Sequence, residues 1–194
     1  MHEATPTPSA WLTRWAPLVA AGGTVLDLAC GSGRHLRWLA AQGFRVTGVD
    51  RDAAAVEALR PLAEIVVADL EDGSPWPLAE RRFDGIVVTH YLWRPLLPRI
   101  AQALESGGVL VYETFAEGQQ RYGRPSKPQF LLQPGELLSA FAGLRTVAYE
   151  DGLEAEPERR VQRLVAVAPP RIGDFEARRL LPPRAVTPLG TAQT

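Results

Sequence analysis

The stretch TVLDLACGSGR, residues 24–34, decides the fold. Residues 24–29 form a short, mostly apolar run, which is typical of a strand buried in a parallel sheet. Gly31 and Gly33 follow, and glycines allow the chain to turn tightly. Residues 34–42 then place apolar side chains at helical intervals. The sequence therefore predicts a strand, a glycine turn and a helix in succession.

The same alternation of strands and helices continues as far as residue 115. Ser9 is a candidate N-cap for a helix over 9–20, and Asp52 for one over 53–60. A further helix is predicted over 95–105, ended by Gly107 and Gly108, and further strands over 45–49, 65–68, 83–89 and 109–115. This pattern predicts an α/β fold, a Rossmann-like three-layer sandwich around a mostly parallel sheet.

The remainder of the chain departs from this pattern. A helix is predicted over 134–142, and two strands over 145–149 and 161–168 follow with no helix between them. Such a pair predicts an antiparallel hairpin at the edge of the sheet. The last stretch, 169–194, is rich in proline and is predicted to be a tail outside the domain.

Polar residues stand where the predicted strands end, and ligands of open α/β sheets bind at those carboxyl ends. The small residues of the turn at 29–33 let a ligand approach the backbone, and the start of the next helix favours an anionic group. Asp50 follows about 20 residues later, where a carboxylate can accept hydrogen bonds from two ribose hydroxyls. The expected ligand is therefore a nucleoside.

The glycine pattern decides between two nucleoside cofactors. A dinucleotide fingerprint read from Gly31 places Leu36 where its third glycine belongs, which disfavours an NAD-dependent oxidoreductase. Read from Asp27 and Ala29, the pattern acidic-x-(G/A)-x-G-x-G resembles motif I of the class I S-adenosylmethionine (SAM)-dependent methyltransferases. The resemblance extends over 24–115 through VTGVDRD, VVADLED, FDGIVV and the glycine pair before the last strand.

A second resemblance lies beyond motif I. The stretch YETFAEGQQRYGRPSKPQFLLQPGELL, residues 112–138, is similar to an uncharacterised group of bacterial class I methyltransferases, loosely similar to the tellurite-resistance enzymes. It implies one methyltransferase domain over 1–168. That domain comprises the N-terminal helix at about 9–20, a SAM-binding core at about 24–115, and a substrate loop and C-terminal hairpin at about 116–168.

The resemblance implies contacts to the methionine part of SAM from the first motif. Asp27 would help to hold the amino group, with bracing of the turn as the alternative. Ala29, Cys30, Gly31 and Gly33 would form the turn that approaches the methionine, and alanine at the first of these positions departs from the family's glycine. The Cys30 side chain is expected to be a small buried filler.

The later motifs would hold the nucleoside part of SAM. Asp50 would bind the ribose, with a helix cap as the alternative, and Arg51 would lie beside the adenine. The Asp69 carboxylate would accept from the adenine amino group, and the Leu70 backbone N–H would donate to the ring. A simple turn is the alternative for Asp69.

Candidates for the acceptor side follow the fourth and fifth strands. His90 is a candidate base, because its ordinary pKa lies near neutral pH, or else a ring packed against the cofactor. Glu113 is a second candidate, because a carboxyl group ending a central strand is costly to bury without a task. Tyr91 and Arg94 are tentative substrate residues, with packing as the alternative for the tyrosine.

The loop over 117–129 is cationic and aromatic. Arg121, Tyr122, Arg124 and Lys127 are expected either to close over an anionic small substrate or to form a solvated surface. Direct methyl transfer to a small molecule needs mainly alignment, so a strong base is optional. A SAM-binding protein without catalysis is the second alternative function.

Composition narrows the remaining classes. The 194 residues carry a net charge of −1, which argues against a nucleic-acid partner. The single cysteine excludes an intrachain disulfide, and neither a secretory signal, a membrane span nor a metal-ligand cluster is visible. A cytoplasmic enzyme is expected, and the sequence leaves its oligomeric state open.

Overall fold

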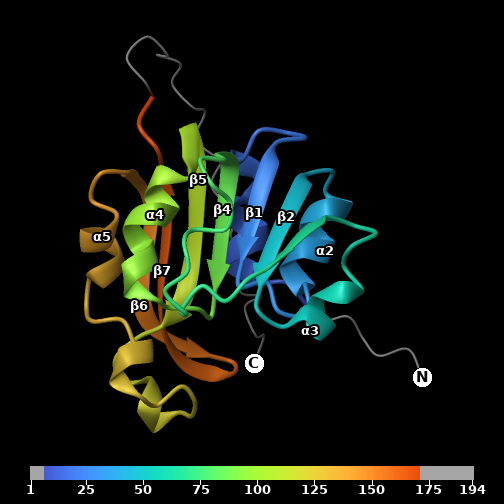
Figure 1. Ribbon diagram of the computed structural model, residues 1–194. Coiled ribbons are helices and arrows are strands. Elements are labelled where there is room, and N and C mark those ends of the chain that lie inside the picture. The colour runs from blue at the N-terminus through green and yellow to red at the C-terminus, as the bar shows by residue number, and fades with distance from the viewer. Residues whose placement is uncertain (1–6, 171–194) are drawn as a thin grey trace, which may run out of the picture.

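The computed structural model describes residues 7–170, which form a seven-stranded sheet with helices on both faces (Figure 1). The first half of the sequence supplies four strands of this sheet and most of the helices that join them. In chain order these elements are α1 (Ala10–Trp15), η1 (Ala16–Leu18), β1 (Thr24–Leu28), α2 (Arg34–Ala41), β2 (Arg45–Asp50), α3 (Ala53–Glu57), β3 (Glu64–Val67) and β4 (Phe83–Thr89).

The second half adds the helices of the opposite face and the rest of the sheet. These elements are η2 (Arg94–Leu96), α4 (Leu97–Gln102), β5 (Leu104–Phe115), η3 (Gln119–Arg121), η4 (Pro128–Phe130), α5 (Glu136–Ala140), β6 (Arg145–Ala155) and β7 (Glu158–Val167).

The strand order is β3-β2-β1-β4-β5-β7-β6. Strands β1 to β5 are parallel, β7 runs antiparallel to β5, and β6 completes a hairpin with β7 at the edge. The predicted α/β sandwich with an antiparallel edge hairpin is therefore confirmed. The order reverses between β1 and β4, which places the binding crevice of such sheets beyond their carboxyl ends.

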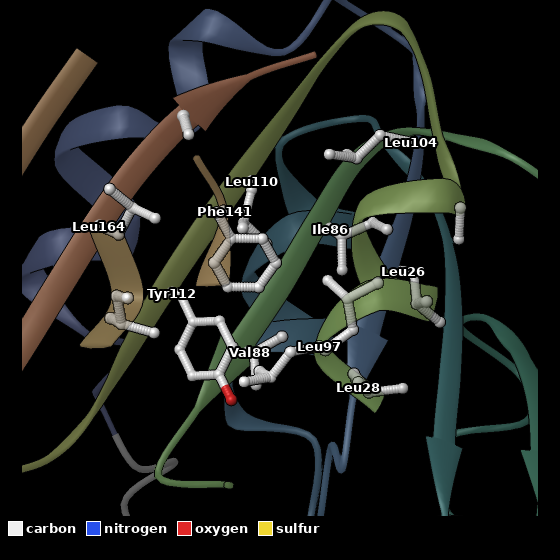
Figure 2. Close-up of a cluster of buried hydrophobic side chains, with 14 of the residues drawn as sticks. Leu26, Leu28, Ile86, Val88, Leu97, Leu104, Leu110, Tyr112, Phe141 and Leu164 are labelled. Atoms are coloured by element: carbon white, nitrogen blue, oxygen red, sulfur yellow. The ribbon is translucent and has the colours of Figure 1, made fainter. Parts of the chain in front are cut away.

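Alternation of side chains along each strand builds two separate cores. Leu26 and Leu28 of β1 pack with α4 and α5 on one face, where the rings of Tyr112 and Phe141 lie 5.9 Å apart (Figure 2). Val25, which directly precedes Leu26 in sequence, packs with α1, α2 and α3 on the other face. Both faces of the sheet are therefore covered, as expected for parallel strands.

Two predicted boundaries were wrong around the glycine pair. The helix predicted over 95–105 ends at Gln102, and β5 begins at Leu104 rather than after the glycines. A shift of register in the β4–β5 pairing contains the pair. A Cβ on Gly108 would lie 2.9 Å from two backbone carbonyl oxygens, so the pair permits an irregularity within the strand rather than ending a helix.

Other elements differ in length from their predictions. Ser9 caps α1 as predicted, since its hydroxyl accepts from the Trp11 and Leu12 N–H groups, but the helix is shorter and passes into η1. Asp52 caps α3, which ends at Glu57. The edge hairpin is longer than predicted, because β6 and β7 run on to Ala155 and back from Glu158. The tail prediction for 171–194 lies outside the described residues.

Gly33 provides a test of the turn that starts α2. Its φ of 78° is left-handed, and a Cβ there would lie 2.5 Å from both terminal methyl carbons of the buried Leu59. Gly33→Ala is therefore expected to lower the free energy of unfolding by about 2–5 kcal/mol, through backbone strain and overpacking together. Urea unfolding curves measure this loss.

Gly43→Ala is the matched control. Gly43 has a similar φ of 85°, but nothing lies within 4 Å of an added Cβ. Only the backbone strain should remain, about 1–2 kcal/mol. Equal losses in the two variants would contradict the proposed contact with Leu59.

Candidate functional site

The candidate site lies at the carboxyl edge of the parallel strands. In Figure 1 the arrowheads of β1, β2 and β4 point to the lower edge, where the yellow loop after β5 and the turn between β6 and β7 also lie. Segments far apart in sequence therefore meet at the edge where the topology predicts a ligand.

The turn after β1 adopts a left-handed backbone at three positions. Ala29, Gly31 and Gly33 have φ values of 54°, 52° and 78°. The Gly31 N–H donates to the Asp50 carboxylate at 2.7 Å, which fixes the turn against the end of β2. Ala29 carries a strain of about 1–2 kcal/mol that glycine would avoid. The departure from the family's glycine thus concerns backbone conformation as well as size.

A pocket of about 180 Å³ opens beside this turn. Five of the nine residues predicted to bind the cofactor line it, and Ala68, Glu71 and Tyr91 complete the wall. The five are Ala29, Asp50, Arg51, Asp69 and Leu70.

The acidic residues of this pocket also organise its walls. Asp50 accepts from the Asp52 N–H at 3.0 Å through its second oxygen. The Asp69 carboxylate accepts from the Glu71 N–H at 2.9 Å and lies 3.7 Å from the Arg51 guanidinium. Asp69 therefore forms the turn that was its alternative prediction and lines the pocket as well.

Asp27 lies behind the turn in a dry environment. It is 1% exposed, and its Oδ2 has no hydrogen-bond partner among the described residues. Burial raises the pKa of the carboxyl group from 3.8 to about 7. A buried acceptor without a donor is costly, so this atom suits a cationic donor from a ligand.

The Cys30 side chain points into the core. A Cβ built on Gly48 would lie 3.0 Å from its sulfur, and burial raises the pKa of the thiol to about 12. The side chain is thus the buried filler that the sequence suggests, and only the backbone of Cys30 belongs to the turn. Its protonated thiol disfavours a role as nucleophile.

The hydrogen-bonding groups of the site fit SAM by their chemistry. The unpartnered oxygen of Asp27 suits the amino group, and the carboxylate of Asp50 suits ribose hydroxyls. No atom lies within 4 Å of a Cβ built on Gly31, so the turn presents bare backbone to the site.

A second pocket, of about 260 Å³, adjoins the first. Glu71 and Tyr91 line both pockets. The second is otherwise walled by the ends of β4 and β5 and by the loop after β5, through His90, Leu92, Thr114, Phe115, Pro125 and Phe130. The Tyr91 hydroxyl is buried, and this burial raises the pKa of the phenol above its usual range.

His90 stands at the end of β4 with an unusual backbone. Its φ is 54°, and its ring stacks on Phe115 with centroids 4.8 Å apart. The Nδ1 atom lies 3.4 Å from the Arg34 guanidinium, and Nε2 lies 3.1 Å from that of Arg159. Burial, followed by the charge of Arg34, lowers the pKa of the imidazole. His90 is therefore neutral at neutral pH.

Glu113 is tied into the protein through both carboxylate oxygens. Its Oε1 accepts from the Ser9 hydroxyl at 3.1 Å, and its Oε2 accepts from Arg163 Nε at 2.5 Å. The Arg163 guanidinium also donates to Glu150 and Glu154. This network disfavours Glu113 as a base and makes it the link between α1, β5 and β7.

The remaining acceptor candidates separate into two groups. Arg94 donates to Glu136 twice and to the carbonyls of Gln129 and Leu131, so it holds the loop against α5. The side chains of the cationic loop are exposed and line neither of the two pockets; these are Arg121, Tyr122, Arg124 and Lys127. The loop reaches the second pocket through Pro125 and Phe130 instead.

Sequence reasoning missed several groups around His90. Arg34 and His35 directly follow the glycine turn, and His35 Nδ1 lies 3.0 Å from the Thr89 hydroxyl. Burial lowers the pKa of His35 to about 3. The position of Arg34 at the helix start could have signalled its role. Arg159 has no local signal, because it reaches the site through the length of the hairpin.

The described residues, 7–170, contain no group of three or more His, Cys, Asp or Glu side chains placed to hold a metal ion. None of their helices has the length and apolar character needed to cross a membrane.

The raised pKa of Asp27 predicts a pH-dependent stability. Between pH 4 and 7 the folded protein holds a proton that the unfolded chain releases, so the free energy of unfolding falls as pH rises through this window. Asp27→Asn removes this dependence. The variant should gain stability relative to the parent by up to about 4 kcal/mol between pH 4 and pH 8.

Urea unfolding at several pH values measures the difference. Asp84→Asn serves as the control, because Asp84 accepts hydrogen bonds from Thr24 at the opposite end of β1. A constant difference between the Asp27 variant and the parent across the window would show that Asp27 titrates normally.

Comparison with known proteins agrees with this geometry. Residues 25–108 match the model of a methyltransferase domain. A ribosomal protein L11 methyltransferase of Thiobacillus denitrificans is 41% identical over 103 residues, covering 50% of this chain and 34% of the relative. The chain therefore matches only about a third of that curated relative's length.

Solved structures show the same fold. TehB from Haemophilus influenzae superposes with a TM-score of 0.68 at 17% identity, over 83% of this chain and 62% of TehB. A TehB-like SAM-dependent methyltransferase from Corynebacterium glutamicum gives 0.60 at 23% identity, over 81% and 86%. Residues 25–108 therefore match a methyltransferase domain, and the chain has the fold of the SAM-dependent methyltransferases among these solved structures.

Proposed function

We propose that the chain is an enzyme that transfers the methyl group of SAM to a small, anionic acceptor, and that residues 1–168 act as one unit. The observation that carries this proposal is the pair of adjoining pockets at the carboxyl edge of the sheet. The first pocket has carboxylates placed to accept hydrogen bonds from a nucleoside, and the second pocket shares Glu71 and Tyr91 with the first. Two neighbouring pockets of different chemistry suit a transferase with two substrates.

The chain's residues would divide the cofactor between them. Asp27 would take the amino group, and the Gly31–Gly33 turn the rest of the methionine part. Asp50 would bind the ribose. The adenine would lie among Arg51, Asp69 and Leu70. Bound SAM supplies a methyl group on a positively charged sulfur, which a nucleophile can attack directly.

The second pocket would hold the acceptor and exclude water. Phe115, Pro125 and Phe130 give it apolar walls, and a dry site strengthens the electrostatic interactions within it. Transfer requires the nucleophile about 3–3.5 Å from the methyl carbon and correctly aligned. Because Glu113 is paired and Cys30 stays protonated, we infer that alignment rather than a dedicated base does most of the work.

Positive charge favours an anionic acceptor. Arg34 and Arg159 contact His90 at the pocket wall. The exposed cations of the 117–129 loop are close in sequence to Pro125, which lines the pocket. The relative's name points to a ribosomal protein as a different acceptor. Turnover with ribosomal protein L11 distinguishes that acceptor from a small molecule.

Calorimetry and turnover test the proposed function. The parent should bind SAM and S-adenosylhomocysteine (SAH), and Asp50→Ala should weaken this binding about tenfold or more, because charge-assisted hydrogen bonds contribute roughly 1.5–3 kcal/mol each. SAH should form from SAM when a metabolite extract is added. Binding of NAD but not SAH would contradict the proposal, and turnover only with ribosomal protein L11 would replace the small acceptor.

Because Asp50 also fixes Gly31, its variant needs a stability control. Asp52→Ala removes the cap of α3 without touching the pocket wall. The two variants should lose comparable stability, whereas only Asp50→Ala should lose cofactor affinity.

The loop cations give a further prediction. Arg121→Ala combined with Arg124→Ala should raise the KM for an anionic acceptor several-fold and leave kcat nearly unchanged, because exposed charges steer and hold a ligand weakly. The effect should shrink at high salt. Arg37→Ala combined with Arg45→Ala, on the α2 side, is the control, and an unchanged KM in the loop variant would assign the loop to the solvated surface.

A further inference from the structure

The His90 ring lies between two arginines that come from opposite ends of the sequence. Arg34 is the first residue of α2, and Arg159 lies beside the turn of the β6–β7 hairpin. Their guanidinium nitrogens lie 3.4 Å from Nδ1 and 3.1 Å from Nε2. The His90 side chain is 28% exposed and that of Arg159 is 21% exposed, so a small ligand can reach both.

This cluster has more hydrogen-bond donors than acceptors. A neutral imidazole has one N–H donor and one acceptor nitrogen, whereas a guanidinium has only donors. Since each ring nitrogen of His90 faces an arginine, only one of the two contacts can be a hydrogen bond. At the other nitrogen two donors face each other, and an oxygen acceptor from outside would satisfy both.

Only one of the two arginines forms an ion pair with a neighbouring acid. Arg159 forms an ion pair with Glu154, and Glu113 Oε1 lies 3.9 Å from His90 Nε2 but is held by Ser9. Arg34 forms no ion pair with an acid among the described residues. Among the described residues, no carboxylate therefore contacts the Arg34 guanidinium on the Nδ1 side of the ring, and the buried Asp27 acts on it only through space.

The backbone of His90 adds an independent indication. Only three non-glycine residues among those described have a positive φ, and two of them, Ala29 and His90, stand at this edge. Each such conformation costs about 1–2 kcal/mol, and strain of this kind concentrates at functional sites. The strained residue also walls the second pocket.

We propose that Arg34, His90 and Arg159 form the binding seat for an oxyanion, a carboxylate or phosphate, of the methyl acceptor. The inference rests on the proposed function, because it assumes that the acceptor enters the second pocket. It makes His90 a binding group that donates or accepts beside two arginines, rather than a base. The planar donor fork of arginine suits such oxygens.

The test uses inorganic phosphate and acetate as probes. Each is titrated into the full-length protein, with and without SAH, while NMR follows the ring nitrogens of His90. Saturable shifts are expected in the parent. Arg159→Gln should raise the Kd for phosphate about tenfold or more, because it removes a charge-assisted hydrogen bond.

Arg160→Gln is the matched control. Arg160 is the next residue along β7 and has the same charge, but its guanidinium lies 3.3 Å from Asp151 instead of contacting His90. Its phosphate affinity should equal that of the parent. Circular dichroism confirms that both variants are folded.

Three outcomes would contradict this oxyanion-binding site. The first is an absence of saturable shifts in the parent, and the second is equal phosphate affinity in the parent and in Arg159→Gln. The third is a loss of SAH affinity in Arg159→Gln together with competition between phosphate and SAH. The last outcome would assign the oxyanion to the cofactor's own carboxylate. Failure of the parent to bind SAH would instead refute the proposed function, and the titration without SAH would still decide the seat.

Discussion

The hydrogen bond from the Gly31 N–H to the Asp50 carboxylate is the contact on which the candidate site depends. It joins the exit of β1 to the end of β2 at 2.7 Å. The glycine turn can stay open because a neighbouring strand holds it, and the same carboxylate forms part of the pocket wall. One acidic side chain thus both fixes the turn and lines the pocket beside it.

The strands, the turn and the caps around the first pocket could be predicted from the sequence because their determinants are local. The strand 24–28, the turn to Gly33 and the caps Ser9 and Asp52 each depend on residues within a few positions of one another. The predicted boundaries of helices and strands were wrong where a distant segment of the chain determines them. The glycine pair belongs to β5 because β4 accommodates it there, and nothing between residues 103 and 109 reveals that pairing.

The surroundings of His90 and Glu113 could not be predicted in the same way because they are assembled from long-range contacts. Glu113 was a candidate catalytic base at a strand end, yet Ser9 and Arg163 approach it from both ends of the described chain. Arg94 looked like a substrate ligand, but Glu136 neutralises it. In both cases the sequence shows a charged residue at a suitable place and does not show the opposite charge that folding brings to it.

The edge hairpin extends past the sheet that carries it. Pairing of β5 with β7 ends at Phe115 and Val161, whereas β6 and β7 stay paired as far as Ala155 and Glu158. Insertions or exchanges at this overhanging turn would leave the β1–β4 framework untouched while altering what faces His90. The framework that carries the first pocket and the turn that carries Arg159 are thus separate parts of the chain, and a change of sequence in one need not disturb the other.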